Sequence, residues 1–276
     1  MERQLGLMAG AGTLPARAAA EARRQGWRVL AFAFDHAPTL DGEADTVIPS
    51  SLTDVQAVLS VLQERRVEAV LFAGKLAAQS ILDRADALDE AGHRIAAGGL
   101  SDSALTQMVL ATFGAMGIEV LDQRRFLGPH LFSERSLAAR GLTSRPPTES
   151  EWEEVRAGVM LARTMASQGI GQTVVRARGV TVAVEAAEGT DDTIRRGTRL
   201  AGPGAVVVKA VAPAHDFRFD VPAVGPATLQ VMAAGRARVL AVERGNVLLA
   251  DPAEVVRIAG DADIAVVGVG ADGERG

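Results

Sequence analysis

Short apolar segments alternate with helical segments along the chain, and this alternation constrains the fold more than any other feature. The apolar segments Leu5–Ala9, Val29–Phe34 and Glu68–Ala73 have the length and composition of buried strands. Helices are expected between them, at about Pro15–Gln25 and Thr53–Arg65. Because strand, helix and strand joined by short connections build a parallel sheet, we predict an α/β protein.

The second half repeats the alternation but is separated from the first by a stiff segment. Pro146 and Pro147 favour an extended linker. Thr148 and Glu151, three residues apart, form the capping-box pattern that begins a helix. The predicted domains are an N-terminal domain at 1–140, a linker at 141–150 and a mixed α/β C-terminal domain at 151–276.

Composition excludes several classes of function. The 276 residues carry a formal net charge of −5, which disfavours nucleic acid as a partner. The chain has no cysteine, so thiolate nucleophiles, zinc–thiolate sites and iron–sulfur clusters are excluded. No apolar stretch approaches the roughly 20 residues that span a bilayer. We therefore expect a cytoplasmic protein, with contact at the membrane surface as a further option.

Lysine is rare in this chain. Of 29 Lys and Arg residues only Lys75 and Lys209 are lysine, which leaves 29 − 2 = 27 arginines. Both lysines end a predicted strand, and ligands of open parallel sheets bind beyond the carboxyl ends of the strands. A compact ammonium suits close contact with phosphate, so these lysines are candidate phosphate ligands. Chance survival is the alternative.

The first strand leads into a glycine turn at Gly10-Ala11-Gly12, followed by Thr13 and Leu14 at the start of a helix. Backbone N–H groups in this position can receive a phosphate. A dinucleotide fingerprint would require a third glycine where this chain has Pro15, which disfavours a nicotinamide-dependent oxidoreductase. A tight turn without a ligand is the alternative.

Two polar segments of the second half are further candidates. Glu188 and Asp191 precede and begin a predicted helix, where they are either capping groups or oxygen ligands of a hard cation. Asp216, Arg218 and Asp220 alternate with apolar residues, so an extended segment would place all three on one face. That face is either a solvated edge or part of a site.

Taken in order, these motifs resemble the LpxI-type UDP-2,3-diacylglucosamine pyrophosphatases of lipid A biosynthesis. The resemblance runs almost from end to end. It rests on Gly6–Pro15, Phe72–Lys75, Asp102–Leu105, Gly169–Gln172, Val184–Asp191, and Lys209 followed by Asp216–Gly225.

This resemblance implies a Rossmann-like N-terminal domain, a distinct α/β C-terminal domain, and a substrate held in a cleft between them. It implies metal-dependent hydrolysis of the substrate's pyrophosphate to UMP and 2,3-diacylglucosamine 1-phosphate (lipid X), with Mg²⁺ or Mn²⁺ as cofactor. It also leaves room for peripheral contact with the inner face of the inner membrane and for a homodimer. Acyl chains require an apolar cleft, which methionines such as Met108 and Met165 could line, although core packing accounts for most of them.

The resemblance also assigns residues. In the family an essential aspartate lies at the position of Asp220, the first candidate for catalysis and metal binding. The other catalytic candidates are Asp191, Glu188 and Lys209, and Asp191 is also a candidate metal ligand. The candidates for substrate binding are Gly10, Gly12, Thr13, Leu14, Gly74, Lys75, Gln172, Gly189, Thr190, Asp216 and Arg218.

The chain departs from the family pattern at four positions. Ala11 replaces a glycine, Ser103 an aspartate, Ala212 a lysine and His215 a glutamine. Such losses near a phosphate site allow an alternative function, a nucleotide-sugar or lipid-phosphate binding protein that kept the fold without turnover.

Overall fold

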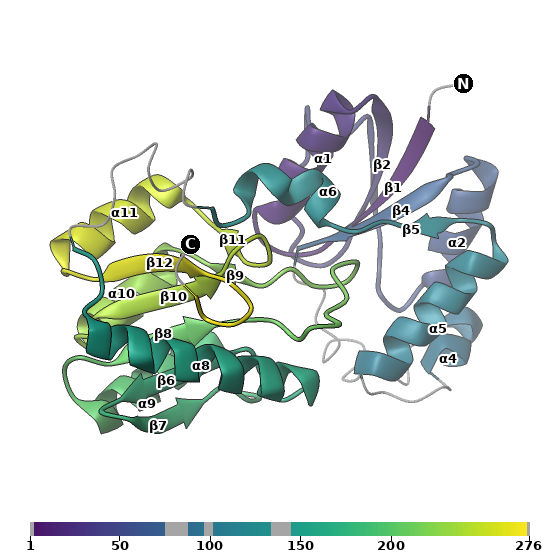
Figure 1. The fold of residues 1–276 in the computed structure, drawn as a ribbon. Coiled ribbons are helices and arrows are strands. Elements are labelled where there is room, and N and C mark those ends of the chain that lie inside the picture. Colours follow the sequence, from purple (N-terminus) through teal and green to yellow (C-terminus); the bar gives the residue numbers. More distant parts are fainter. Residues whose placement is uncertain (1–2, 75–87, 97–101, 134–144, 275–276) are drawn as a thin grey trace. The chain divides into compact units, whose positions relative to one another are not determined.

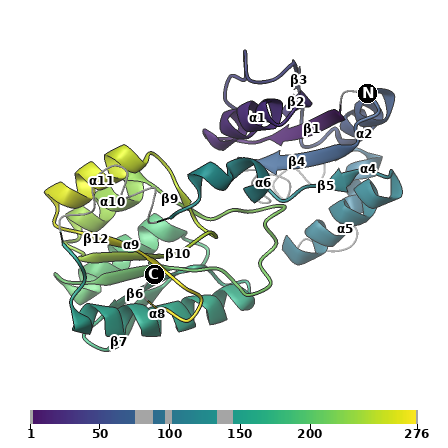
Figure 2. The ribbon, with the colours of Figure 1, turned by 45° about the horizontal axis from the view of Figure 1, so that its top comes forward.

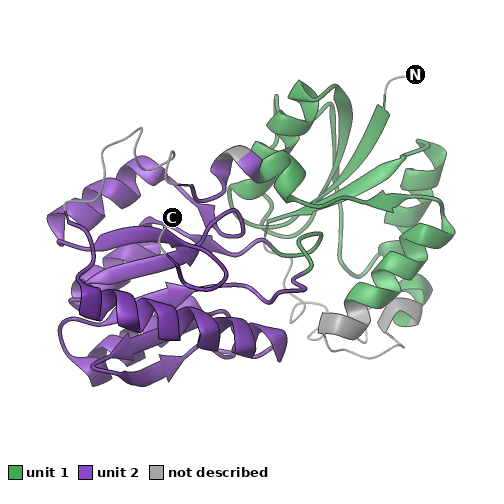
Figure 3. Cartoon of the chain, in the orientation of Figure 1, with its two compact units in different colours: residues 1–127, 216–220 green, residues 128–215, 221–276 purple. Residues whose placement is uncertain are grey.

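The chain folds into two compact α/β units (Figure 3). The computed structural model describes residues 3–74, 88–96, 102–133 and 145–274. Unit 1 comprises Met1–Leu127 and Asp216–Asp220, and unit 2 comprises Gly128–His215 and Val221–Gly276. The chain therefore changes units three times, after residues 127, 215 and 220.

Unit 1 is built on a parallel five-stranded sheet in the order β3-β2-β1-β4-β5 (Figure 2). Its strands are β1 (Arg3–Ala9), β2 (Trp27–Ala33), β3 (Thr46–Pro49), β4 (Ala69–Ala73) and β5 (Glu119–Val120). Its described helices are α1 (Leu14–Arg24), α2 (Val55–Glu64), α4 (Glu90–Ala96), α5 (Asp102–Ala115) and α6 (Arg124–Leu127). The three strands predicted for this half are confirmed.

Helices lie on both faces of this sheet, as a parallel sheet requires. Met8 and Phe32 face α2 and α5, where they pack with Val58, Leu62 and Phe113. Helix α1 contacts α6, and α4 contacts both α2 and α5. In Figures 1 and 2 the first pair of helices lies on one side of the sheet and α2, α4 and α5 on the other.

Unit 2 is built on a mixed five-stranded sheet in the order β12-β10-β8-β6-β7, in which β6 is antiparallel to both of its neighbours. Its strands are β6 (Thr173–Ala177), β7 (Val180–Val184), β8 (Val206–Lys209), β10 (Val239–Glu243) and β12 (Ala265–Val269), with a separate parallel pair of β9 (Ala223–Val224) and β11 (Leu248–Leu249). Its described helices are the 3-10 helix η2 (Gly128–His130), α8 (Glu149–Ser167), α9 (Thr190–Ala201), α10 (Pro226–Ala234) and α11 (Pro252–Asp261).

The alternation of side chains along β8 divides the core of unit 2 into two layers. Val206 and Val208 pack against Trp152 and Val155 of α8. Val207 points to the opposite face, into the cluster beneath α9, α10 and α11 that contains Ile194. Figure 2 shows α8 on one face of the sheet and α10 and α11 on the other. Burial on both faces explains why β8 reads as an uninterrupted valine run.

Helix α8 begins as its sequence predicts. The Thr148 hydroxyl accepts the N–H of Glu151, and the Glu151 carboxylate accepts the N–H of Thr148, which completes a capping box. Residues 141–144 of the predicted linker lie outside the described part of the chain. No helix within the described ranges combines the length and apolar character needed to cross a membrane.

Several details differ from prediction. The edge strand β3 is mostly exposed and ends in proline, so it lacks the apolar signal of a buried strand. The predicted extended segment from Asp216 is wrong, because residues 217–219 form a turn. The Asp216 carboxylate accepts the backbone N–H of Arg218 at 3.1 Å, a local bond that competes with extended backbone.

Candidate active site

One edge of the unit 2 sheet gathers most of the residues predicted for this half. Lys209 ends β8 and is paired in register with Thr173, which begins the antiparallel strand β6. Strand β7 runs parallel to β8 and delivers Glu185 to the same edge, where its N–H donates to the carbonyl of Thr173 at 2.8 Å. The reversal at β6 thus brings together residues that are far apart in sequence.

Lys209 is almost completely buried at this edge, with 5% of its surface exposed. Its ammonium donates to the hydroxyl of Thr190 at 2.7 Å and to that of Thr173 at 3.3 Å. The Thr190 hydroxyl in turn donates to Glu185 Oε1 at 2.8 Å. The lysine therefore ties the end of β8 to the start of α9 and to the end of β7.

Glu185 is the anionic partner in this cluster, although we did not predict it as a site residue. Its Oε2 lies 3.8 Å from Lys209 Nζ and accepts the backbone N–H of Gln172 at 3.2 Å. Burial raises the pKa of the Glu185 carboxyl, but the Lys209 charge and the hydrogen bonds from Thr173, Thr190 and Gln172 together lower that pKa below its ordinary value. Glu185 is therefore held as a carboxylate.

Glu188 and Asp191 flank the start of α9, and both have partners within unit 2. Glu188 pairs with Arg196, and the pKa of its exposed carboxyl is lowered by that hydrogen bond. Asp191 Oδ1 accepts from the Thr228 hydroxyl at 3.2 Å. Gly189 lies between them and directly precedes the helix, and its φ of 81° suits glycine. Neither contact caps α9, whose N-cap residue is Gly189, but Asp191 lies in the first turn, where a negative charge stabilises a helix.

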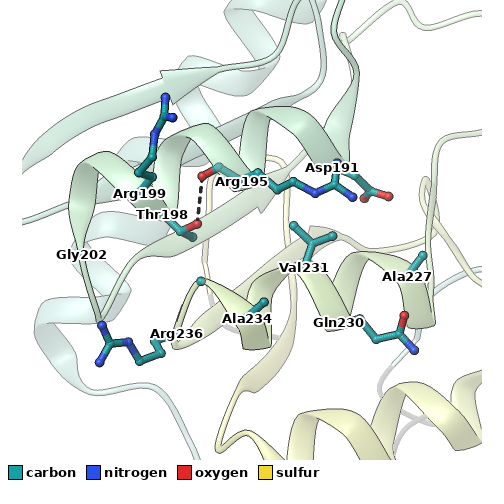
Figure 4. Close-up of a pocket in the computed structure, with 11 residues that line it drawn as sticks. Asp191, Arg195, Thr198, Arg199, Gly202, Ala227, Gln230, Val231, Ala234 and Arg236 are labelled. Atoms are coloured by element: carbon teal, nitrogen blue, oxygen red, sulfur yellow. Dashed lines mark hydrogen bonds between the residues drawn. The ribbon is translucent and has the colours of Figure 1, made fainter.

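A groove of about 610 Å³ runs between α9 and α10 (Figure 4). Asp191 lies near one end, and Gly202 and Arg236 lie near the other. Arg195 and Arg199 also line it, so the charged residues of its described lining are mostly basic. The groove follows the two helices, and neither Lys209 nor Glu185 is among its described lining residues.

A second buried carboxylate at the same edge was missed in the sequence. Glu243 ends β10, is 3% exposed, and accepts from Arg163 of α8 at 2.7 Å. It also accepts the Asn246 amide at 2.8 Å and the N–H of Val211 at 3.1 Å. The sequence signal that could have identified Glu243 is a single charged residue at the end of an apolar strand.

The predicted glycine turn lies at the carboxyl edge of the unit 1 sheet. The N–H of Gly10 donates to the carbonyl of Ala73 at 2.9 Å and so continues the pairing of β1 with β4. Thr13 precedes α1 without capping it through its side chain, and Leu14 begins the helix. Gly12 adopts φ 97°. These residues do lie together.

Gly74 packs closely against the glycine turn. Its φ is 83°, and a Cβ placed on it would lie 2.7 Å from the carbonyl oxygen of Ala11 and 2.8 Å from Pro15. Only glycine fits this conformation and this approach. The following residue, Lys75, lies outside the described residues, and so its predicted role stays a prediction.

Asp220 belongs to a short segment that folds onto unit 1 even though its neighbours in sequence belong to unit 2. Phe219 packs on Phe72 of β4, with ring centroids 5.0 Å apart. The N–H of Gln123 donates to the carbonyl of Phe217 at 3.0 Å, and the Arg124 guanidinium lies 3.6 Å above the Phe217 ring. This anchored turn presents an exposed Asp220.

The other two charged residues of this segment pair with each other. Arg218 donates through Nε to Asp216 Oδ1 at 2.8 Å and through Nη2 to Oδ2 at 2.7 Å. Of the candidate residues predicted for the second half, unit 1 thus carries Asp216, Arg218 and Asp220, and unit 2 carries those around Lys209. The predicted C-terminal catalytic domain at 151–276 includes a segment that the structure groups with unit 1.

The described residues do not form a metal centre by themselves. In the part of the chain that the structure describes, no three His, Asp or Glu side chains gather as ligands. Asp191 and Asp220, the predicted ligands, belong to different units. Carboxylate oxygen suits Mg²⁺, which is often held by one or two carboxylates together with substrate phosphates. A metal therefore stays a prediction.

Comparison with known proteins defines the class. Residues 4–130 match the LpxI N-terminal domain, and residues 139–267 match the LpxI C-terminal domain. Together the two matches cover most of the chain, and the chain belongs to the LpxI family. The resemblance seen in the motifs is confirmed.

A curated relative narrows the comparison. It is the UDP-2,3-diacylglucosamine pyrophosphatase LpxI of Caulobacter vibrioides, 28% identical over 282 residues that cover 97% of this chain and 98% of the relative. Alignment over nearly both full lengths means that the two proteins share both domains.

Two solved structures show a remote similarity to this chain. Phosphoribosylglycinamide synthetase from Anaerococcus prevotii is 11% identical, with a TM-score of 0.23, over 75% of this chain and 44% of that one. N5-carboxyaminoimidazole synthetase from Staphylococcus aureus is 16% identical, with a TM-score of 0.23, over 74% and 46%. The chain spans less than half of either protein, and likeness at this level carries no argument about function.

Proposed function

We propose that this protein hydrolyses the pyrophosphate bond of UDP-2,3-diacylglucosamine to UMP and 2,3-diacylglucosamine 1-phosphate (lipid X), a step of lipid A biosynthesis. The observation that carries the proposal is membership of the LpxI family along nearly the whole chain, with a pyrophosphatase as relative. The enzyme is then a hydrolase of phosphorus-containing anhydrides.

The arrangement of each unit supports this proposal. In unit 1 the glycine turn and the strand-end glycine lie at the carboxyl edge of a parallel sheet, where phosphate ligands commonly bind. The strand order 3-2-1-4-5 suits a Rossmann-like domain. In unit 2 the Lys209 cluster also lies at strand ends. Each unit thus offers polar groups at the ends of its strands.

Asp220 is the proposed catalytic carboxylate. Its exposed position at the end of an anchored turn suits contact with a substrate phosphate, a metal or an attacking water. Asp191 would be the second metal ligand. Bound Mg²⁺ or Mn²⁺ would supply Lewis-acid stabilisation of the diphosphate charge. The N–H groups around Gly12 and Thr13 would receive phosphate oxygens.

Lys209 fits a positioning role better than direct contact. Its ammonium is buried, and its hydrogen bonds reach the hydroxyl groups of Thr190 and Thr173. By fixing Thr190, it holds the first turn of α9 and so the neighbouring Asp191. The same burial favours the second candidate function, a binding protein without turnover, because fewer cations then face a phosphate.

One further feature follows from the proposed substrate. A glucosamine that bears two acyl chains resides in a membrane, so we propose a cytoplasmic enzyme that meets its substrate at the inner face of the inner membrane. A homodimer is compatible with this arrangement.

The test is to incubate the protein with UDP-2,3-diacylglucosamine and Mg²⁺ or Mn²⁺ and to measure the release of UMP. Chelation of the metal should abolish this release. Asp220→Asn should lower kcat by at least about a hundredfold, the usual scale for losing a catalytic carboxylate. Asp41→Asn, which changes an exposed carboxylate elsewhere in unit 1, should leave kcat unchanged. Binding without UMP release by the unmodified protein would favour the binding-protein alternative.

A further inference from the structure

Unit 1 contains an apolar cavity that the residues discussed so far do not explain. Its volume is about 150 Å³, and it lies between the sheet and α2, α4 and α5. Met8, Phe34 and Phe72 contribute from or beside the strands, and Leu59 and Val109 from the helices. Almost all of the exposed lining is carbon.

We propose that this cavity binds the distal part of one acyl chain of the substrate. The proposal rests on the proposed function, because the expected substrate carries two acyl chains. A cavity of this size with an aliphatic and aromatic lining stays dry and can hold benzene, a molecule of six carbons. It therefore suits a hydrocarbon segment of roughly that size.

The location of the cavity supports this occupant. Phe72 lines the cavity and also packs against Phe219, the residue before Asp220. Met8 lies two residues before Gly10 of the glycine turn. A chain that enters the cavity past Phe72 would therefore begin beside the segment that bears the proposed catalytic carboxylate.

The lining also argues against a polar ligand. Among the described residues, its polar side chains are Ser51 and Thr112, and Thr112 already donates its hydroxyl to the carbonyl of Met108 at 2.8 Å. Ser51 is hydrogen-bonded to Thr53 at 2.7 Å. A sugar or nucleotide would lose its hydrogen bonds to water there without replacement, whereas a hydrocarbon would lose none. The methionine among the described lining residues is Met8, which is not one of the methionines predicted for an acyl-chain cleft.

The experiment fills the cavity. Val109→Phe and Leu59→Phe add carbon to its wall, whereas Val61→Phe makes the same kind of change on α2 outside the lining. Each methylene displaced should weaken binding about fourfold. We expect the first two variants to raise KM for the diacylated substrate on the order of tenfold with kcat unchanged, because the contact is the same in ground and transition states.

Two comparisons make the result decisive. KM for UDP-glucosamine, which lacks acyl chains, should be unaffected by these variants, and Val61→Phe should behave like the unmodified protein. Equal KM changes for both substrates, or none for either, would overturn the proposal.

A separate binding measurement distinguishes failure of the cavity from failure of the proposed function. A dansyl-labelled fatty acid should bind to the unmodified protein and to Val61→Phe, and on the order of tenfold more weakly to Leu59→Phe. If the protein releases no UMP, the proposed function fails while this result still decides the cavity. Equal binding to all three proteins would refute an acyl-chain site.

Discussion

Replacement of Lys209 by Met tests whether the buried lysine is chiefly a partner for Glu185. Two unit charges 3.8 Å apart attract by about 4 kcal/mol at an effective dielectric constant of 20. Removing one member of a buried pair typically costs 3–5 kcal/mol, because the other charge remains buried. Glu185 would keep the Thr190 hydroxyl and the Gln172 N–H. We therefore expect Lys209→Met to lower the free energy of unfolding of unit 2 by about 3 kcal/mol.

The protein offers a fluorescent reporter for each unit. Its two tryptophans are Trp27 in unit 1 and Trp152 in unit 2. In a Trp27→Phe background, urea unfolding followed by fluorescence reports on Trp152, which packs beside β8. Each variant is made in this background, so that the cost of Trp27→Phe cancels.

The double variant Lys209→Met with Glu185→Gln is the matched control. Once both charges are removed, no unpaired charge stays buried, and the loss should fall to about 1 kcal/mol. A loss below about 1 kcal/mol for Lys209→Met alone, or a double variant no more stable than the single one, would refute this account.

The pH dependence of stability gives a second test of the pairing between Lys209 and Glu185. In the folded protein the pKa of Glu185 is lowered, so its stabilising effect is present above the unfolded pKa and is lost as pH falls through the folded pKa. Removal of Lys209 takes away one of the causes that lower this pKa, so the pKa of Glu185 should rise from its value in the unmodified protein. The cost of Lys209→Met should therefore be largest near neutral pH and shrink on acidification. A cost independent of pH would contradict the pairing.

Two further substitutions test the other strand-end contacts. Gly74→Ala should destabilise unit 1 by about 2 kcal/mol or more, because Gly74 has a positive φ and lies close to Ala11. Gly114→Ala in α5, where a Cβ has open space, should instead stabilise unit 1 by about 0.5 kcal/mol. Trp27 fluorescence would measure both changes, and equal effects would contradict the steric argument. Glu243→Gln should cost about 2 kcal/mol because Arg163 loses its buried anionic partner, and an unchanged urea midpoint would show that this pair contributes little.

Local signals predicted much of the fold. The valine run of β8 and the apolar segments of β1 and β4 identify buried strands, because burial on both faces leaves no polar positions. The capping box at Thr148 fixes the start of α8 through bonds between near neighbours. Such signals fail at β3, where an edge strand needs little apolar surface.

The sequence by itself determined the α/β class, the two halves, the family and the candidate residues, because motif order and hydrophobic periodicity are local properties. Only the tertiary structure decided how these residues group. It placed Asp220 with unit 1, Lys209 beside Glu185, and Glu243 against Arg163. These groupings depend on strand order and on the packing of Phe219 against Phe72, which join residues distant along the chain. No local pattern encodes such contacts, since each exists only once both strands and helices are in place.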